Sequence, residues 1–144
     1  MTHLTLELAR TIVAGARGEA QREGFKPLTV VVLDAGGHVV AVEREDGSST
    51  RRFEIAHGKA HGAIALGLGS RALMARAEQQ PYFISAAAGA IGGALVPVPG
   101  GVLVRDEGGA VIGAVGISGE SSDNDERAAV AGIEGAGLVP QVGA

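Results

Sequence analysis

The chain has 144 residues, no cysteine and a formal net charge of −4, with 46% hydrophobic, 19% charged and only 3% aromatic residues. These values fit one self-folding domain, residues 1–144, with an aliphatic core. They exclude a nucleic-acid binder, which needs clustered Lys and Arg, and they exclude disulfides, thiolate metal sites and Cys nucleophiles. No apolar run reaches a membrane span and no signal-peptide layout is present, so we expect a cytoplasmic protein.

The first predicted element is an amphipathic helix over residues 5–23, with Thr5 as N-cap and Gly24 as its C-terminal stop. Two β-rich runs follow, at residues 28–33 and 38–43. The turn-forming residues 34–37 join them, which predicts an antiparallel hairpin. Both runs are apolar on both faces. This predicts central strands covered twice, by helices and by another subunit.

The rest of the chain is also predicted to consist of helices and a hairpin. Helices are predicted at about residues 52–67 and 70–80, and a second hairpin at 101–105 and 110–117. A last helix starts at Asp123, with Glu126 completing a pattern similar to a capping box. Residues 89–99 read as a rigid approach to the second hairpin that lines a pocket together with Tyr82 and Phe83. The predicted fold class is α+β: one antiparallel sheet with helices packed on it.

Several segments, taken in order, resemble the GlcG/HbpS family, which includes the C-terminal domain of PduO-type proteins. The quoted segments are residues 31–38, 45–48, 54–60, 100–103, 113–119 and 125–126. The resemblance spans nearly the whole chain. It implies a profilin-like antiparallel sheet flanked by helices, and a homo-oligomer. It also implies a small-molecule ligand, since some members bind haem and others are linked to cobalamin.

The strongest local signal is the pair His57 and His61, four residues apart on one face of a predicted helix. One interpretation is a haem or metal site with an apolar lining. In a chain without Cys, haem iron needs an imidazole or, as weaker alternatives, Met74 or Tyr82. Zinc is less favoured because no third His lies nearby in sequence. The alternative interpretation is a helix surface on which one His packs and the other is hydrated.

Basic residues near this helix are candidates for holding carboxylates. Lys59 lies on the opposite side of the helix, where it either points into a pocket or extends along apolar surface to water. Arg44, Arg51 and Arg52 converge in sequence near the same helix and are predicted either to grip ligand acids or to be ordinary surface charges. Asp34 is interpreted as a turn residue rather than a catalytic one.

The acidic segment after the second hairpin has two interpretations. Residues 116–122 lead from a strand into a helix N-terminus, where backbone N–H groups are able to hold an anion. However, Glu120, Asp123, Asp125 and Glu126 would repel an anion, so capping of the helix is the favoured role. Neither Ser85 nor Ser118 lies in a nucleophile-elbow context, which argues against a serine hydrolase.

Three hypotheses for function follow. The first is an oligomeric binder of haem or a related tetrapyrrole, with His57 or His61 on iron and with Arg44, Arg51, Arg52 or Lys59 on its acids. The second is a cofactor-free enzyme acting on a small organic acid, with Lys59 and Arg44 holding the substrate and His57 as general acid or base. The third is an accessory subunit without chemistry of its own.

Overall fold

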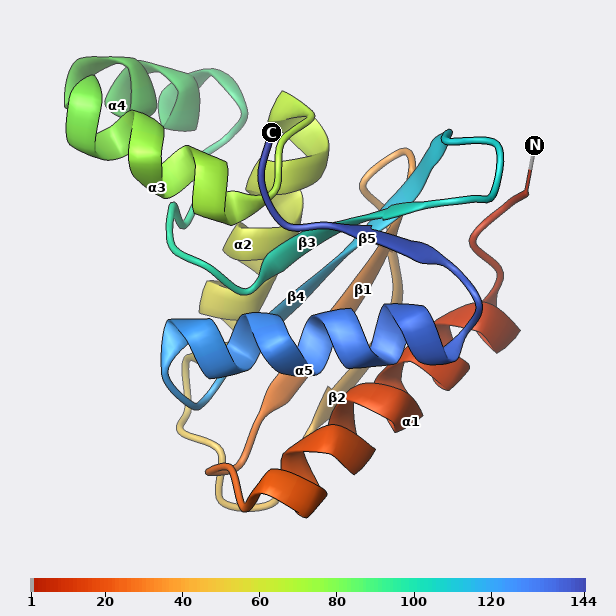
Figure 1. The fold of residues 1–144 in the computed structure, drawn as a ribbon. Coiled ribbons are helices and arrows are strands. Elements are labelled where there is room, and N and C mark those ends of the chain that lie inside the picture. Colours follow the sequence, from red (N-terminus) through yellow and green to blue (C-terminus); the bar gives the residue numbers. More distant parts are fainter. Residues whose placement is uncertain (1) are drawn as a thin grey trace.

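A five-stranded antiparallel sheet in the order β2-β1-β4-β3-β5 forms the centre of the molecule (Figure 1). The structure is a computed structural model, and it describes residues 2–144. The strands are β1 (Thr29–Asp34), β2 (Val39–Arg44), β3 (Gly101–Arg105), β4 (Val111–Ser118) and β5 (Val139–Gln141). The helices are α1 (Leu6–Glu23), α2 (Arg52–Leu66), α3 (Ser70–Gln79), α4 (Pro81–Ala90) and α5 (Ser122–Gly135).

The helices form two layers on the sheet. Helices α1 and α5 lie side by side over one face, and α2 lies over the other (Figure 1). Alternate residues of β1 serve the two cores: Val30 and Val32 pack with α1 and α5, whereas Val31 and Leu33 pack under α2. This is the period of two that a strand imposes. The predicted α+β fold, an antiparallel sheet flanked by helices, is confirmed.

The helix boundaries follow capping chemistry. Thr5 caps α1 by accepting a hydrogen bond from the Leu8 N–H, and Gly24 ends it in the left-handed conformation (φ 68°), both as predicted. The prediction was wrong for α5. Its N-cap is Ser121, which accepts from the Asn124 N–H, because the helix begins one residue before Asp123.

The prediction that both strands of the first hairpin are covered twice holds for only one of them. Strand β1 is buried from Thr29 to Leu33, but β2 lies at the edge of the sheet. Val39 and Val42 of β2 remain 50% and 38% exposed. The prediction for β2 was wrong because α2 packs on β1, β3 and β4 and stops short of β2. One strand face is therefore apolar and open.

Two elements were not predicted. Helix α4 occupies residues that we expected to be pocket lining, and it projects from the body together with α3 (Figure 1). Tyr82 of α4 is 70% exposed. The short strand β5 pairs with β3 at the other edge of the sheet. Within residues 2–144, none of the helices combines the length and hydropathy that crossing a bilayer requires.

Candidate functional site

One face of α2 carries a stack of three rings. Phe53, His57 and His61 follow one another at intervals of four residues, so their side chains point from the same helix face. The ring centroids of Phe53 and His57 are 5.7 Å apart, and those of His57 and His61 are 5.5 Å apart. Each pair is inclined by 21°. The sequence prediction that the two imidazoles share one face is therefore confirmed.

The ring stack lies beside the open strand β2. Val42 pairs with Val31 and Val39 pairs with Leu33, and paired residues project to the same face of a sheet, so both valines face the α2 side. A Cβ placed at Gly37 in the hairpin turn would lie 3.9 Å from His61. We call the exposed surface formed by Val39, Val42, Phe53, His57 and His61 the α2–β2 face. It is apolar except for the two imidazoles.

The two imidazoles have different environments. Partial burial lowers the pKa of His57, and the neighbouring His61 lowers that pKa further. The Nδ1 atom of His61 lies 2.9 Å from the carbonyl oxygen of Ala94. Among residues 2–144, no hydrogen bond is made to the His57 ring. The two rings are therefore held in different ways, one by stacking and the other also by a backbone carbonyl.

Two of the three candidate arginines bond to the segment that connects β2 to α2. Arg44 donates to the Ser48 carbonyl. Arg52 donates to the Oγ atoms of Ser49 and Ser118, and both of these distances are 3.0 Å. Within the described part of the chain, neither guanidinium has a carboxylate partner. Arg51 is ion-paired with Glu54 at 3.0 Å and is exposed. The structure thus brings Arg44 and Arg52 to one turn and leaves Arg51 outside it.

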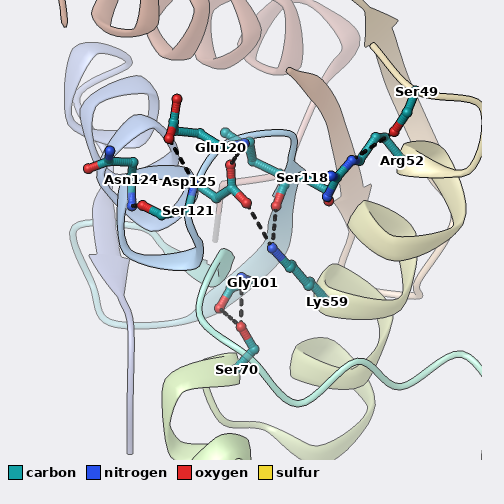
Figure 2. Close-up of polar contacts among 11 residues, drawn as sticks. Ser49, Arg52, Lys59, Ser70, Gly101, Ser118, Glu120, Ser121, Asn124 and Asp125 are labelled. Atoms are coloured by element: carbon teal, nitrogen blue, oxygen red, sulfur yellow. Dashed lines mark hydrogen bonds and ion pairs between the residues drawn. The ribbon is translucent and has the colours of Figure 1, made fainter. Parts of the chain in front are cut away.

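Lys59 points away from the α2–β2 face, into the interior. Its Nζ donates to the Ile117 carbonyl at 2.8 Å and pairs with Asp125 Oδ2 at 3.0 Å (Figure 2). The other carboxylate oxygen of Asp125 accepts from the Glu120 N–H at 2.9 Å. The side chains of Lys59 and Asp125 are only 3% and 2% exposed. Lys59 therefore links α2 to the first turn of α5 around the end of β4.

Burial acts on both members of this pair in the direction of the neutral forms. It lowers the pKa of Lys59 and raises the pKa of Asp125, while their mutual attraction opposes both shifts. The closed packing leaves no space at Nζ, because a Cβ at Gly100 would lie 2.8 Å from it. The sequence left two interpretations of the Lys59 side chain open, one in a pocket and one reaching water. The structure shows a third arrangement, in which the side chain is enclosed and ion-paired.

The other predicted acidic residues serve local structure. Asp34 accepts from the Gly36 and His38 N–H groups, at 3.0 and 2.9 Å, and so closes the first hairpin. Glu120 accepts from the Lys26 N–H at 2.8 Å. Asp123 and Glu126 are both paired with Arg71. Within residues 2–144, no group of three His, Cys, Asp or Glu side chains is placed to hold a metal ion.

Comparison with known proteins decides the family. Residues 4–134 match the family described as "Haem degrading protein HbpS-like". The chain belongs to the HbpS-like family. A search of curated proteins found no match.

Solved structures agree with this assignment. A crystal structure of a PduOC:heme complex has a TM-score of 0.84 at 25% identity and covers 95% of this chain and 97% of that one. A crystal structure of HbpS has a TM-score of 0.80 at 29% identity, with 93% and 90% covered. The Klebsiella pneumoniae protein ORFY, at 23% identity and a TM-score of 0.84 over 95% and 93% of the two chains, shares the fold.

The α2–β2 face of this HbpS-like chain fits a haem in chemical terms. It offers an imidazole donor, aromatic and aliphatic surface, and two arginines without carboxylate partners near the start of the same helix. The sequence pointed to His57, His61, Arg44 and Arg52. It did not point to the Ala94 carbonyl, because a main-chain atom leaves no signal in residue type.

Proposed function

We propose that this HbpS-like protein binds haem or a related tetrapyrrole on the α2–β2 face. The observation that carries the proposal is the pair of imidazoles stacked on Phe53 beside the exposed valines of an uncovered edge strand. Such a surface suits a planar, largely apolar macrocycle, and an imidazole on it is a common ligand for the iron at its centre. A protein of the same fold at 25% identity has a structure as a haem complex, which supports the same ligand class here.

In this proposal, the iron and the carboxylates of the ligand are bound by different residues. His57 or His61 supplies the nitrogen for the iron, and the bound haem supplies a redox-active iron centre. Arg44 and Arg52 bind its carboxylates through charge-assisted hydrogen bonds in this proposal, and Arg51 does so only if it leaves Glu54. Lys59 takes no part in this proposal, since its ammonium is buried and already partnered.

Titration of the purified protein with hemin tests the proposal. We expect a shifted Soret band in the wild type and its loss in a His57→Ala, His61→Ala double variant. Single His3→Ala and His38→Ala variants are matched controls, since both side chains are exposed and lie outside the α2–β2 face. An unchanged Soret band in the double variant would remove α2 as the source of the iron ligand.

We further propose that the protein is a homo-oligomer of a reducing compartment such as the cytoplasm. Within residues 2–144, strand β2 has an edge that no other strand pairs with and carries exposed valines, and such an edge is a template for pairing with another chain. The chain has no cysteine, which is compatible with a reducing compartment. Light scattering at micromolar concentration tests the assembly, and a monomer of 14.4 kDa would contradict it.

A further inference from the structure

The contact between His61 and Ala94 fixes where the ring carries its hydrogen. The Ala94 oxygen lies 2.9 Å from Nδ1, and a carbonyl oxygen accepts hydrogen bonds but never donates them. Nδ1 is therefore the protonated nitrogen. In the neutral ring the lone pair is left on Nε2, on the side away from the carbonyl. A histidine that ligates a metal is held in this way, with its second nitrogen bound to a carbonyl or carboxylate.

The Ala94 carbonyl is itself held against α2 by the two residues that follow it. The Val96 N–H donates to the Gly58 carbonyl at 3.1 Å, and Leu95 is buried in the cluster that also contains Leu73 and Ile84. Gly58 and Gly62 permit this approach. A Cβ at Gly58 would lie 2.6 Å from the Val96 side chain, and a Cβ at Gly62 would collide with that of Leu95. The carbonyl is thus fixed relative to the imidazole.

His57 lacks an equivalent support. Within the described residues its ring makes no hydrogen bond and is positioned only by stacking between Phe53 and His61. The two imidazoles also project from one helix face with a 21° angle between their planes. Side chains from one helix face reach a bound macrocycle from the same side, so only one of these two imidazoles would be able to bind its iron.

We propose that His61 is the iron ligand that α2 provides, that the Ala94 carbonyl is its positioning group, and that His57 packs against the His61 ring without binding iron. The proposal rests on the haem-binding function proposed above. It assigns unequal roles to two histidines that are indistinguishable in the sequence, and it gives the segment after α4 a role in the site.

The first test uses the haem-free protein at neutral pH. Long-range ¹H–¹⁵N NMR correlations of the imidazole rings report which nitrogen carries the hydrogen. We expect His61 in the Nδ1–H form, with the exposed His3 as an unrestrained reference. A His61 ring in the Nε2–H form would overturn the assignment, whether or not haem binds.

The second test compares single variants by hemin titration and absorption spectroscopy. His61→Ala should lose the histidine-ligated Soret band, and added imidazole should restore it. His57→Ala should keep the band, with affinity reduced by less than about tenfold. A band that survives His61→Ala but is lost in His57→Ala would overturn this assignment alone. A wild-type protein without any Soret shift would overturn both the assignment and the haem-binding function.

The third test addresses the positioning group. Leu95→Ala removes the packing that holds the Ala94 carbonyl but leaves both imidazoles in place. Loss of such a supporting contact typically costs about 10–100-fold in metal affinity. We expect that loss in hemin affinity, together with a lower iron–histidine stretching frequency in resonance Raman spectra of the ferrous form.

The matched control is Ile84→Ala, since Ile84 belongs to the same cluster and is as buried as Leu95, at 9% exposed. It should leave the stretching frequency unchanged, and circular dichroism checks that both variants fold. Equal frequencies in the two variants would overturn the role of the Ala94 carbonyl.

Discussion

Helix α2 carries polar side chains on two of its sides. The two sides differ in how far other residues of the chain bury and hydrogen-bond these side chains. On one side, Lys59 is enclosed and both hydrogen-bonded and ion-paired by residues of this chain. On the other side, His57 and His61 are half-exposed beside Val39 and Val42, which remain 50% and 38% exposed. The enclosed side explains how the helix is fixed. The open side is where a ligand still has contacts to make.

The largest expected effect comes from breaking the enclosed side. Asp125→Ala leaves the Lys59 ammonium buried without its counter-charge, and removal of one member of a buried ion pair costs about 3–5 kcal/mol. Urea unfolding should show this loss in the free energy of unfolding. A Lys59→Met, Asp125→Leu double variant is the control, because apolar replacement of both partners is often nearly neutral. Equal losses in the single and double variants would contradict the ion-pair explanation.

A second substitution tests how closely α2 lies on the sheet near the enclosed side. A Cβ at Gly116 of β4 would collide with the Ala56 carbonyl, a backbone atom that cannot rotate away. Gly116→Ala should therefore lower the free energy of unfolding by about 2–3 kcal/mol. Gly89→Ala is the control, since nothing lies within 4 Å of the added Cβ in α4. A Gly116→Ala variant as stable as wild type would show that α2 can lift from the sheet without cost.

A third substitution tests whether the positive charge of Arg44 contributes to hemin binding on the open side. Arg44→Gln removes a guanidinium that has no carboxylate partner within residues 2–144, so hemin affinity should fall by about 5–10-fold. Arg51→Gln is the matched control, because Arg51 is paired with Glu54, and its effect should stay below about twofold. Hemin titration at two salt concentrations measures both variants. Equal effects would mean that the arginines act only through net charge.

The smallest expected effect on folding comes from comparing the two members of one cross-strand pair. Val42 and Val31 lie opposite each other on β2 and β1, yet Val31 is fully buried and Val42 is 38% exposed. Val42→Ser should change the free energy of unfolding by no more than about 0.5 kcal/mol, as exposed substitutions usually do. Val31→Ser, the control, should cost at least about 2 kcal/mol. Hemin affinity should nevertheless fall in Val42→Ser, and an unchanged affinity would place the ligand elsewhere.

The sequence predicted most of the fold because its signals are local. Thr5 and Gly24 bound the first helix through capping, and the turn-forming residues 34–37 set the first hairpin. It failed at β2 because a run such as Val39–Val42 reads the same at the centre and at the edge of a sheet. Whether a helix covers that run depends on where α2 packs, which is decided by distant residues.

The candidate site divides in the same way. Spacing alone placed His57 and His61 on one face, since helical periodicity is a local property. The partner of Lys59 was not predictable, because Asp125 is 66 residues away and its own sequence context favoured a capping role. The Ala94 carbonyl was equally hidden. Only the glycines at 58 and 62 hinted that another segment lies against α2.

The burial of Lys59 also protects its side-chain amine from amine-reactive reagents in the native protein. The chain has two lysines, and Lys26 is exposed while Lys59 is not. An amine-reactive reagent should modify Lys26 quickly in the native protein and reach Lys59 only when α2 and α5 separate at the end of β4. The ratio of the two acylation rates, read by mass spectrometry of peptides, therefore measures the frequency of that local opening. Acylation of Lys59 thus reports local opening of the native protein, and acylation of Lys26 on the same chain is the reference.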